Sequence, residues 1–229
     1  MCALSMRYRD IKGVNPSFRA FITNLGKYNE GQLVGKWHDF PTTKEKIMQT
    51  FREIGIDGIN YEEFFITDYE VDVKGIYDSL SEYASIDEIN YFVSKIHEMN
   101  NFELEIFESA VALGSYSGSL KNFINLTENL DCFDYIEGVN NDYDLGYYWI
   151  NESGCYDTDS MGKLAEYFDY ESFGRDISID ENGAYTGTGY VRNNGTSFYE
   201  EYDGVNIPDE YKVFAMPKEK PLVKVLKRL

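Results

Sequence analysis

Nine carboxylates lie between residues 122 and 162, and no lysine or arginine lies among them. They are Glu128, Asp131, Asp134, Glu137, Asp142, Asp144, Glu152, Asp157 and Asp159. Carboxylates at this density can do three kinds of chemistry. They can bind a metal cation, they can act in pairs as general acid and base, or they can recognise a cationic surface.

The spacing of these carboxylates does not fit a calcium-binding loop. An EF-hand loop needs a glycine at its sixth position and a glutamate at its twelfth. Counted from Asn140, these two positions hold Leu145 and Asn151. A second count, from Asp157, puts Phe168 at the twelfth position. The sequence therefore predicts no EF-hand.

Histidines are too few for a zinc site or a nucleophile pair of the usual kinds. His38 and His97 are the only two, and neither lies near a cysteine in the sequence. The stretch "GSYSG" at 114–118 places Tyr116 where a nucleophile elbow needs serine. "GTGYVR" at 187–192 lacks the third glycine of a dinucleotide-binding fingerprint, and there is no P-loop. We expect no catalytic residue, no metal and no cofactor.

One enzymatic alternative stays open. A glycosidase needs only two carboxylates at a set separation, often beside aromatic rings that stack on sugar. The chain has so many carboxylates and aromatic residues that such a pair would arise by chance. A carbohydrate-active enzyme is therefore a remote alternative.

The charge is distributed unevenly along the 229 residues, whose net charge is −19. Residues 1–52 contain nine lysines and arginines against four acidic residues, and residues 209–229 contain six against three. The stretch 53–208 has 33 acidic residues and only six basic ones. Such a field repels nucleic acid and anionic membranes and favours a cationic partner surface. We expect no direct nucleic-acid binding and no membrane association.

The composition predicts a folded protein despite this charge. Hydrophobic residues make up 43% of the chain and aromatic residues 16%, so a core can form. Three cysteines do not make a disulfide framework at this length, and no apolar run is long enough to span a membrane. We expect a cytoplasmic location.

Hydrophobic periodicity predicts a small α+β domain at 18–77, after a basic lead-in at 1–17. "FRAFITNLG" at 18–26 alternates as a strand does, and 62–71 is a second strand candidate. "YNEG" predicts a turn between strands, and glycines at 26, 31 and 35 argue against a helix there. Thr42 or Thr43 is a candidate cap for a helix that ends before Gly55.

The period becomes helical over 78–120 and mixed again over 121–192. Ser85 followed by Glu88 predicts a capping box at the start of one central helix. In the third segment, two helices are expected to end at Gly154 and Gly174, and Asn182-Gly183 predicts a hairpin turn. The fold class expected is therefore α+β, with a helical central domain at 78–120, an α+β domain at 121–192 and an appendage at 193–229.

Acidic charge over a firm apolar interior is what a DNA mimic requires. B-DNA presents one negative charge per roughly 1.7 Å of axis, and DNA-binding proteins answer with lysine and arginine. A folded protein with carboxylates at a similar density would fit the same groove. A halophilic surface or a storage protein can have this composition too.

Four motifs resemble the ArdA family of antirestriction proteins. They are "FITNLGKYNEGQLVGKW" (21–37), "DYE" (68–70), "YYWINESG" (147–154) and "DYESFGRDI" (169–177), and they occur in the family's order between Phe18 and Val191. The lead-in and the segment after 192 depart from the family pattern and do not inherit its role.

The resemblance implies a non-enzymatic inhibitor spread by mobile genetic elements. Such proteins mimic bent B-DNA and occupy the groove of type I restriction-modification enzymes, formed by the specificity and modification subunits. The family is described as elongated, with three small domains, and as a homodimer joined through the C-terminal domain. The three segments drawn above agree with that layout.

On this hypothesis, carboxylates of 128–176 take the place of phosphates, with those of 62–108 in support. The first group is Glu128, Asp131, Asp134, Glu137, Asp142, Asp144, Glu152, Asp157, Asp159, Glu166, Asp169, Glu171 and Asp176. The supporting group is Glu62, Glu63, Asp68, Glu70, Asp72, Asp87, Glu88, Glu103, Glu105 and Glu108.

Glycines and aromatic residues of the four motifs are expected to be structural, among them Trp37 and Trp149. Arg175, a rare cation among acids, is expected to pair with a neighbouring carboxylate. The other open alternative is an acidic adaptor that binds some other basic protein, such as a nucleoid protein. It would show no preference for restriction enzymes.

Overall fold

The computed structural model describes residues 15–157 and 159–217. The described chain forms two compact units. Unit 1 contains residue 15, residues 74–79 and residues 95–204, and unit 2 contains residues 16–73, 80–94 and 205–217. Both units combine helices with other elements, and each contains one three-stranded antiparallel sheet, so the expected α+β class is confirmed. The domain boundaries expected from the sequence stay a prediction.

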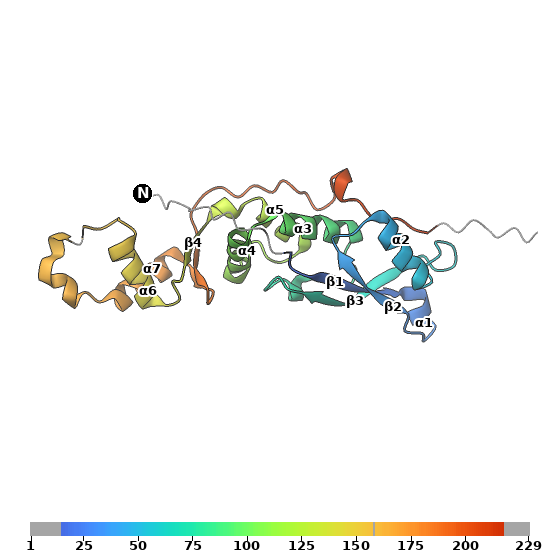
Figure 1. Cartoon of the computed structure of the whole chain (residues 1–229), viewed down its shortest axis with the longest axis horizontal. Coiled ribbons are helices and arrows are strands. Elements are labelled where there is room, and N and C mark those ends of the chain that lie inside the picture. The colour runs from blue at the N-terminus through green and yellow to red at the C-terminus, as the bar shows by residue number, and fades with distance from the viewer. Residues whose placement is uncertain (1–14, 158, 218–229) are drawn as a thin grey trace, which may run out of the picture. The chain divides into compact units, whose positions relative to one another are not determined.

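The sheet of unit 2 has the order β2-β1-β3. Its strands are β1 (Phe18–Asn24), β2 (Gly35–Phe40) and β3 (Phe64–Val71), drawn in blue and cyan in Figure 1. The predicted strands at 18–26 and 62–71 are thus confirmed. Alternation along β1 places Ala20 and Ile22, both fully buried, on the core side.

Helix α2 (Lys44–Glu53) completes the core of unit 2. Thr43 caps it, because its hydroxyl accepts a hydrogen bond from the Lys46 N–H, as the sequence predicted. Ile47 and Phe51 are fully buried. The predicted turn at "YNEG" (28–31) is wrong in part, because its first two residues are the end of a short helix, α1 (Leu25–Asn29). Asn24 caps α1 by accepting from the Lys27 N–H. The sequence analysis gave more weight to the three glycines than to this capping asparagine and therefore missed the helix.

Two central helices lie where the helical period predicts them, at α3 (Ile86–Glu98) and α4 (Asn101–Leu113). Ser85 Oγ accepts from the Glu88 N–H at 3.4 Å. A complete capping box also stands at α4, between Asn100 and Glu103, which the sequence analysis missed.

The sheet of unit 1 has the order β4-β6-β5. Its strands are β4 (Phe133–Glu137), β5 (Ala184–Tyr185) and β6 (Gly189–Asn193). Helix α4 packs on this sheet, and α5 (Leu120–Thr127) packs beside it through the rings of Phe107 and Phe123, 6.2 Å apart. Ile136, Leu145 and Tyr190 form the buried cluster below the sheet.

Helices α6 (Asp142–Tyr147) and α7 (Tyr170–Glu181) are packed with their backbones in close approach. A Cβ added at Gly146 would lie 1.9 Å from the Tyr170 carbonyl, and one at Gly174 would lie 1.8 Å from the Asp142 carbonyl. The expected helix end at Gly174 is therefore wrong, because this glycine lies inside α7 at the crossing. A π-helical turn (Tyr148–Glu152) follows α6, and a 3₁₀ segment (Asp159–Tyr167) precedes α7.

The predicted hairpin turn at Asn182-Gly183 is wrong too. Asn182 adopts a left-handed conformation with φ of 50° and ends α7, so the asparagine-glycine pair is a helix C-cap here. The hairpin of unit 1 turns after it, between β5 and β6.

The segment 194–217, here called the C-terminal strap, forms hydrogen bonds with residues of unit 1 and of unit 2. The boundary of the expected appendage at 193–229 stays a prediction. In unit 1, Asn125 of α5 accepts from the Tyr202 N–H and donates to the Tyr202 carbonyl, both at 2.9 Å. Asn129 makes the same pair of bonds with the backbone of Tyr199, also at 2.9 Å.

In unit 2, α3 holds the strap in a similar way. The amide of Asn90 donates to the Tyr211 carbonyl at 3.0 Å. Asp87 accepts from the Val213 and Phe214 N–H groups, both at 2.6 Å. Residues 218–229, also assigned to the appendage, and the lead-in residues 1–14 lie outside the described residues. No helix in the described part of the chain is long and apolar enough to cross a membrane.

Replacing Asn125 with alanine should destabilise the protein. The change leaves the backbone N–H and carbonyl of Tyr202 buried without these partners, at a cost of about 2–4 kcal/mol in the free energy of unfolding. Urea denaturation measures it. The matched control Gln32→Ala removes an exposed amide and should change this free energy by less than about 0.5 kcal/mol. Equal losses in the two variants would show that the strap contributes nothing through Asn125.

His38 should give unit 2 a pH-dependent stability. Burial lowers its pKa from 6.5 to about 4, helped by Lys36 and Lys46 and opposed by Asp39. Between these two values only the unfolded chain takes up the proton, so acid favours unfolding by about 2 kcal/mol at pH near 4.5. Above the unfolded pKa, both states are neutral and this contribution vanishes.

The variant His38→Gln lacks this titration. Its deficit in the free energy of unfolding relative to the parent chain should therefore shrink by about 2 kcal/mol between neutral pH and pH near 4.5. Other acids titrate in the same range, but they do so in both proteins and cancel in the difference. A deficit that stays constant over this range contradicts the lowered pKa.

Candidate functional site

The predicted phosphate-mimicking carboxylates fall into groups according to the contacts of their side chains. Four of them are held by partners in unit 1, one caps a helix, and seven others are exposed. The side chain of Asp159 lies outside the described residues. The held residues show how the acidic sheet accommodates its charge.

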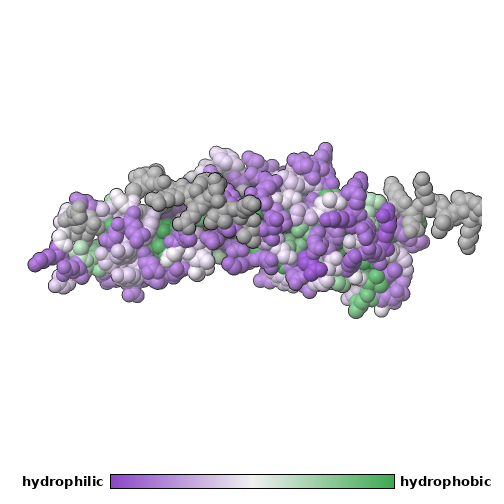
Figure 2. All heavy atoms as spheres, in the orientation of Figure 1, coloured by the Kyte–Doolittle hydropathy of each residue, from purple (hydrophilic) through white to green (hydrophobic). Residues whose placement is uncertain are grey.

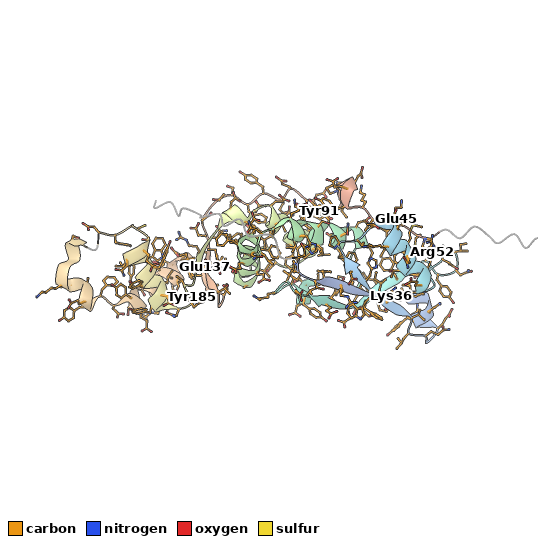
Figure 3. The ribbon with its side chains drawn as sticks, viewed as in Figure 1. Lys36, Glu45, Arg52, Tyr91, Glu137 and Tyr185 are labelled. Atoms are coloured by element: carbon orange, nitrogen blue, oxygen red, sulfur yellow. The ribbon has the colours of Figure 1, made fainter. Side chains whose placement is uncertain are left out.

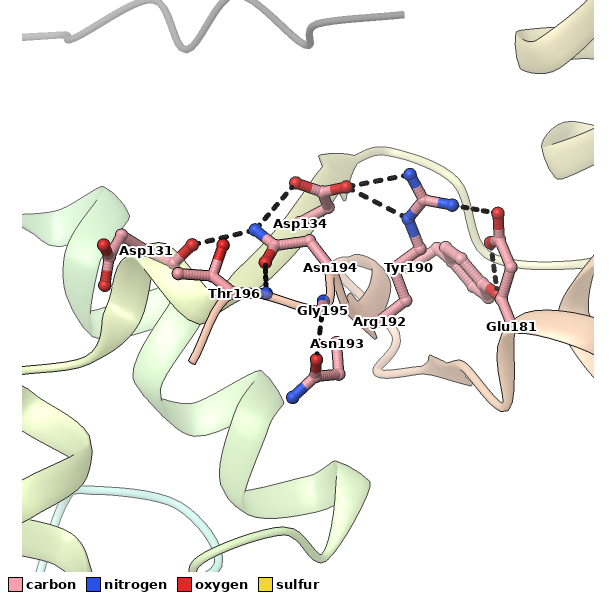
Figure 4. Close-up of polar contacts among 9 residues, drawn as sticks. All are labelled: Asp131, Asp134, Glu181, Tyr190, Arg192, Asn193, Asn194, Gly195 and Thr196. Atoms are coloured by element: carbon pink, nitrogen blue, oxygen red, sulfur yellow. Dashed lines mark hydrogen bonds and ion pairs between the residues drawn. The ribbon is translucent and has the colours of Figure 1, made fainter. Parts of the chain in front are cut away.

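Arg192 of β6 is the central cation of the unit 1 sheet (Figure 4). It faces Asp134 across the β4–β6 register, and its Nε and Nη2 donate to one Asp134 oxygen at 3.0 and 2.8 Å. Its third nitrogen donates to Glu181 at the end of α7. The guanidinium carbon lies 5.1 Å from the centre of the Trp149 ring. The side chains of Arg192, Asp134 and Glu181 are exposed by only 19%, 15% and 19%.

Glu181 also accepts a hydrogen bond from the Tyr190 hydroxyl at 3.0 Å. Burial raises the pKa of Glu181, and the nearby Arg192 opposes that rise. The second oxygen of Asp134 accepts from Asn194 at 3.3 Å. Asp134 is thus an internal carboxylate whose cation comes from its own chain.

Three other predicted residues also have internal partners. Glu128 pairs with Lys95 at 2.7 Å. Asp142 accepts from the Tyr185 hydroxyl at 2.7 Å, and burial, with this contact, raises the pKa of Tyr185. Asp144 accepts from the Asn141 side chain at 2.8 Å, near the start of α6.

Asp169 is exposed and caps α7, because it accepts from the Ser172 N–H at 3.0 Å. Hydrogen bonds from Ser172 lower the pKa of this carboxyl. It is therefore charged and outward-facing while it also serves the helix start.

The remaining carboxylates of the first group are exposed, and none forms an ion pair within residues 15–157 and 159–217. We call them the free carboxylates. They are Asp131, Glu137, Glu152, Asp157, Glu166, Glu171 and Asp176. Asp131 lies in a 3₁₀ turn (Leu130–Cys132) before β4, and Glu137 ends β4. The others come from the π-helical turn and the segment after it, the 3₁₀ segment before α7, and α7, so all belong to unit 1.

Hydrophilic residues cover most of the visible face in Figure 2. Glu137 is the last residue of β4 and is labelled in Figure 3. Its charge helps to raise the pKa of Glu105, for which burial is the larger cause. Repulsion between the exposed Glu137 and the half-buried Glu105 is therefore already present in the isolated chain.

The supporting carboxylates lie in both units and are more often engaged. Glu62, Glu63, Asp68, Glu70 and Asp72 are exposed on or beside β3. Glu70 pairs with Arg19 at 2.9 Å, Asp72 accepts from the Ser17 N–H at 2.8 Å, and Asp68 accepts from the Tyr69 N–H at 2.8 Å.

Those on the central helices, Asp87, Glu88, Glu103, Glu105 and Glu108, are half-buried. Asp87 binds the strap, Glu103 belongs to the capping box of α4, and Glu108 pairs with Lys74 at 3.2 Å. These three side chains therefore form contacts that stabilise the described fold.

Sequence reasoning chose the wrong arginine as the internal cation. Arg175 is exposed on α7 and forms no ion pair within the described residues, although its charge helps to lower the pKa of Asp169. Arg192 holds that place. The sequence offered one signal for Arg192, the alternation of "GYVRN", which identifies a strand but not its partner strand. The pairing with Asp134 follows only from the register of β4 and β6.

No group of three or more histidine, cysteine, aspartate and glutamate side chains in the described part could hold a metal ion. His38 is instead bound on both ring nitrogens, to Thr50 at 2.8 Å and to Thr42 at 2.7 Å. The chemistry that the described carboxylates offer is recognition of positive charge.

Comparison with known proteins gives one family. The model of the family described as Antirestriction protein (ArdA) matches residues 20–192. No curated protein matches the chain. The match includes β4, β5, all but the last residue of β6 and every free carboxylate, and it ends just before the C-terminal strap.

Replacing Arg192 with methionine should destabilise unit 1 strongly. The change leaves two largely buried carboxylates without their cation, at a cost on the order of 3 kcal/mol in the free energy of unfolding. The control Arg175→Met removes an exposed arginine of the same unit and should change stability by less than about 0.5 kcal/mol. Chemical denaturation at neutral pH measures both, and similar losses would contradict the assignment of Arg192 as the internal cation.

Proposed function

The chain belongs to the ArdA family of antirestriction proteins, and from that premise we propose that it inhibits type I restriction-modification enzymes by mimicking B-DNA. The enzyme's DNA-binding groove, formed by the specificity and modification subunits, would receive the acidic surface in place of DNA. The observation that carries this proposal is the set of free carboxylates in unit 1.

These side chains have the two properties that a substitute for phosphate needs. They are exposed and without an ion pair in the described chain, so a partner can reach them and their charge is not already neutralised. They also stand on the ordered elements of unit 1, notably β4, the π-helical turn and α7. A groove that binds DNA carries lysines and arginines for the phosphates, and these would pair with the carboxylates.

The internal contacts of unit 1 favour the same function. Arg192 and Lys95 are used on the half-buried Asp134 and Glu181 and on Glu98 and Glu128. These two cations are thus paired with carboxylates inside the fold, and they do not neutralise the free carboxylates. Each exposed carboxylate would contribute about 0–1 kcal/mol as a rim ion pair, so affinity depends on their number.

Further parts of the proposal come from the family rather than from the described contacts. They are an elongated arrangement of three domains at 18–77, 78–120 and 121–192, a homodimer joined through 121–192, action in the cytoplasm, and carriage on mobile genetic elements. The protein would act by stoichiometric occupation and would turn over no substrate. It would bind no nucleic acid itself, because its own field repels phosphate.

The test is a cleavage assay with a purified type I restriction enzyme, unmethylated DNA and ATP. The protein should inhibit near stoichiometric ratio, and excess DNA or raised salt should relieve the inhibition. A folded sample that inhibits no type I enzyme would contradict the proposal and favour an acidic adaptor for another basic protein.

Neutralising a block of free carboxylates should abolish this inhibition. The variant carries amides at Glu137, Glu152, Asp157, Glu166, Glu171 and Asp176. A loss of about 0.5 kcal/mol at each position would weaken inhibition on the order of a hundredfold, whereas any single change should weaken it by about threefold or less.

A charge-matched control separates the position of these acids from the total charge. It carries amides at six exposed positions outside the predicted site: Glu30, Glu45, Asp78, Glu82, Glu201 and Glu210. This control should inhibit within about threefold of the parent chain. Equal losses in the two blocks would mean that net charge alone acts, and one single substitution that eliminates inhibition without unfolding would contradict a distributed surface.

A further inference from the structure

A pocket of about 290 Å³ lies beside the end of β4 in unit 1. Its polar and aromatic lining consists of Glu137, Tyr143, Asp144, Tyr147, Tyr148 and Glu152. Three carboxylates and three tyrosines thus surround one open space, and no lysine or arginine lines it.

The aromatic wall of the pocket is accessible. Tyr143 is 51% exposed and Tyr147 is 42% exposed. Their rings lie one turn apart on α6, 6.4 Å between centres and inclined by 19°. Tyr170 of α7 supports both from one side, at 5.6 and 5.5 Å. The two rings are therefore fixed in place while they remain open to a ligand.

The carboxylates of the pocket add unneutralised charge. Glu137 and Glu152 are free carboxylates, as defined above. Asp144 is partly engaged by the neighbouring Asn141 side chain and the Asn140 N–H. An aromatic ring face and a carboxylate both attract a cation, and a guanidinium can use the two together.

The chain itself shows twice how such a set holds an arginine. In unit 1, Arg192 lies between Asp134 and Glu181 and over the ring of Trp149 at 5.1 Å.

In unit 2, Arg19 repeats this arrangement. It pairs with Asp39 at 2.7 Å and Glu70 at 2.9 Å, and it lies 5.3 Å from the centre of the Trp37 ring. Two carboxylates and one aromatic ring are thus the surroundings that this fold gives a guanidinium. The pocket presents the same groups, and the described chain places no cation in them.

We propose that this pocket receives one arginine side chain of the restriction enzyme that the acidic surface binds. The inference rests on the proposed function and adds a specific contact to it. Arginine is favoured over lysine because its planar group can stack on a tyrosine ring while it donates to two carboxylates. Tyrosine and arginine are also the residues that most often dominate the energy of an interface.

The double variant Tyr143→Leu/Tyr147→Leu tests the proposal in the cleavage assay. It keeps every carboxylate and removes the rings, so inhibition should weaken by about tenfold to a hundredfold. The variant Tyr143→Phe/Tyr147→Phe keeps the rings and should inhibit within about threefold of the parent chain. Circular dichroism and thermal melting establish that each variant is folded.

A control removes two tyrosines of unit 1 that are more exposed and do not line the pocket. Tyr167 and Tyr199 are 84% and 68% exposed, and Tyr167→Leu/Tyr199→Leu should inhibit as the parent chain does. Unchanged inhibition by the pocket variant, or an equal loss in the control, would overturn the proposal. If the pocket variant instead turns a dimer into a monomer in sedimentation, the pocket serves a contact between copies, and the proposal is overturned in that case too.

A second measurement does not depend on the restriction enzyme. N-acetyl-arginine methylamide, titrated into the protein, should shift the ring resonances of Tyr143 and Tyr147 in NMR spectra. The citrulline analogue, which is uncharged, should not shift them, and the lysine analogue should bind more weakly. Equal shifts with arginine and citrulline would overturn the pocket. A protein that inhibits no type I enzyme but binds arginine here would overturn the proposed function and leave an arginine-binding pocket.

Discussion

The contact of Arg192 with Asp134 and Glu181 is the interaction on which the acidic half of the fold depends. It joins β4, β6 and the end of α7, and it lies over Trp149 of the π-helical turn. These elements also carry or flank most of the free carboxylates. Arg192 neutralises Asp134 and Glu181, which would otherwise be largely buried without a cation. The unpaired carboxylates lie at the surface, where water and salt screen their repulsion.

Unit 1 is also held together by groups that carry no charge. Gly146 and Gly174 allow α6 and α7 to approach closely, and Asn125 and Asn129 bind the backbone of the strap. Amides satisfy both the N–H and the carbonyl of a buried residue without adding a charge, which suits a chain that has few cations to spare. The strap is thus bound to unit 1 through these amides without adding negative charge to the contact.

Local signals made part of this fold predictable. β1 follows from alternation, and α2 follows from its Thr43 cap, because each signal lies within a few residues. Asn182-Gly183 misled because a left-handed residue serves a helix end and a hairpin turn equally well. The strap could not be predicted, since Asn125 and Tyr202 are 77 residues apart and Asn90 and Tyr211 are 121 apart.

The candidate site was predictable as a region and not as a set of side chains. Asp134 and Glu137 are three residues apart on one strand, so their side chains point to opposite faces. The sequence does not say which of the two is exposed, and only the register with β6 gives Asp134 its partner Arg192. The same holds for the pocket, whose tyrosines come from α6 and the π-helical turn after it, and whose acids come from β4, α6 and that turn. On the proposed function, the two kinds of site would act differently. A dispersed set of exposed acids can follow any groove built for phosphates, because each pair is weak and none fixes the geometry. A pocket that encloses one guanidinium does fix it, and it would give a DNA mimic a point of register that the repeating charge of DNA does not provide.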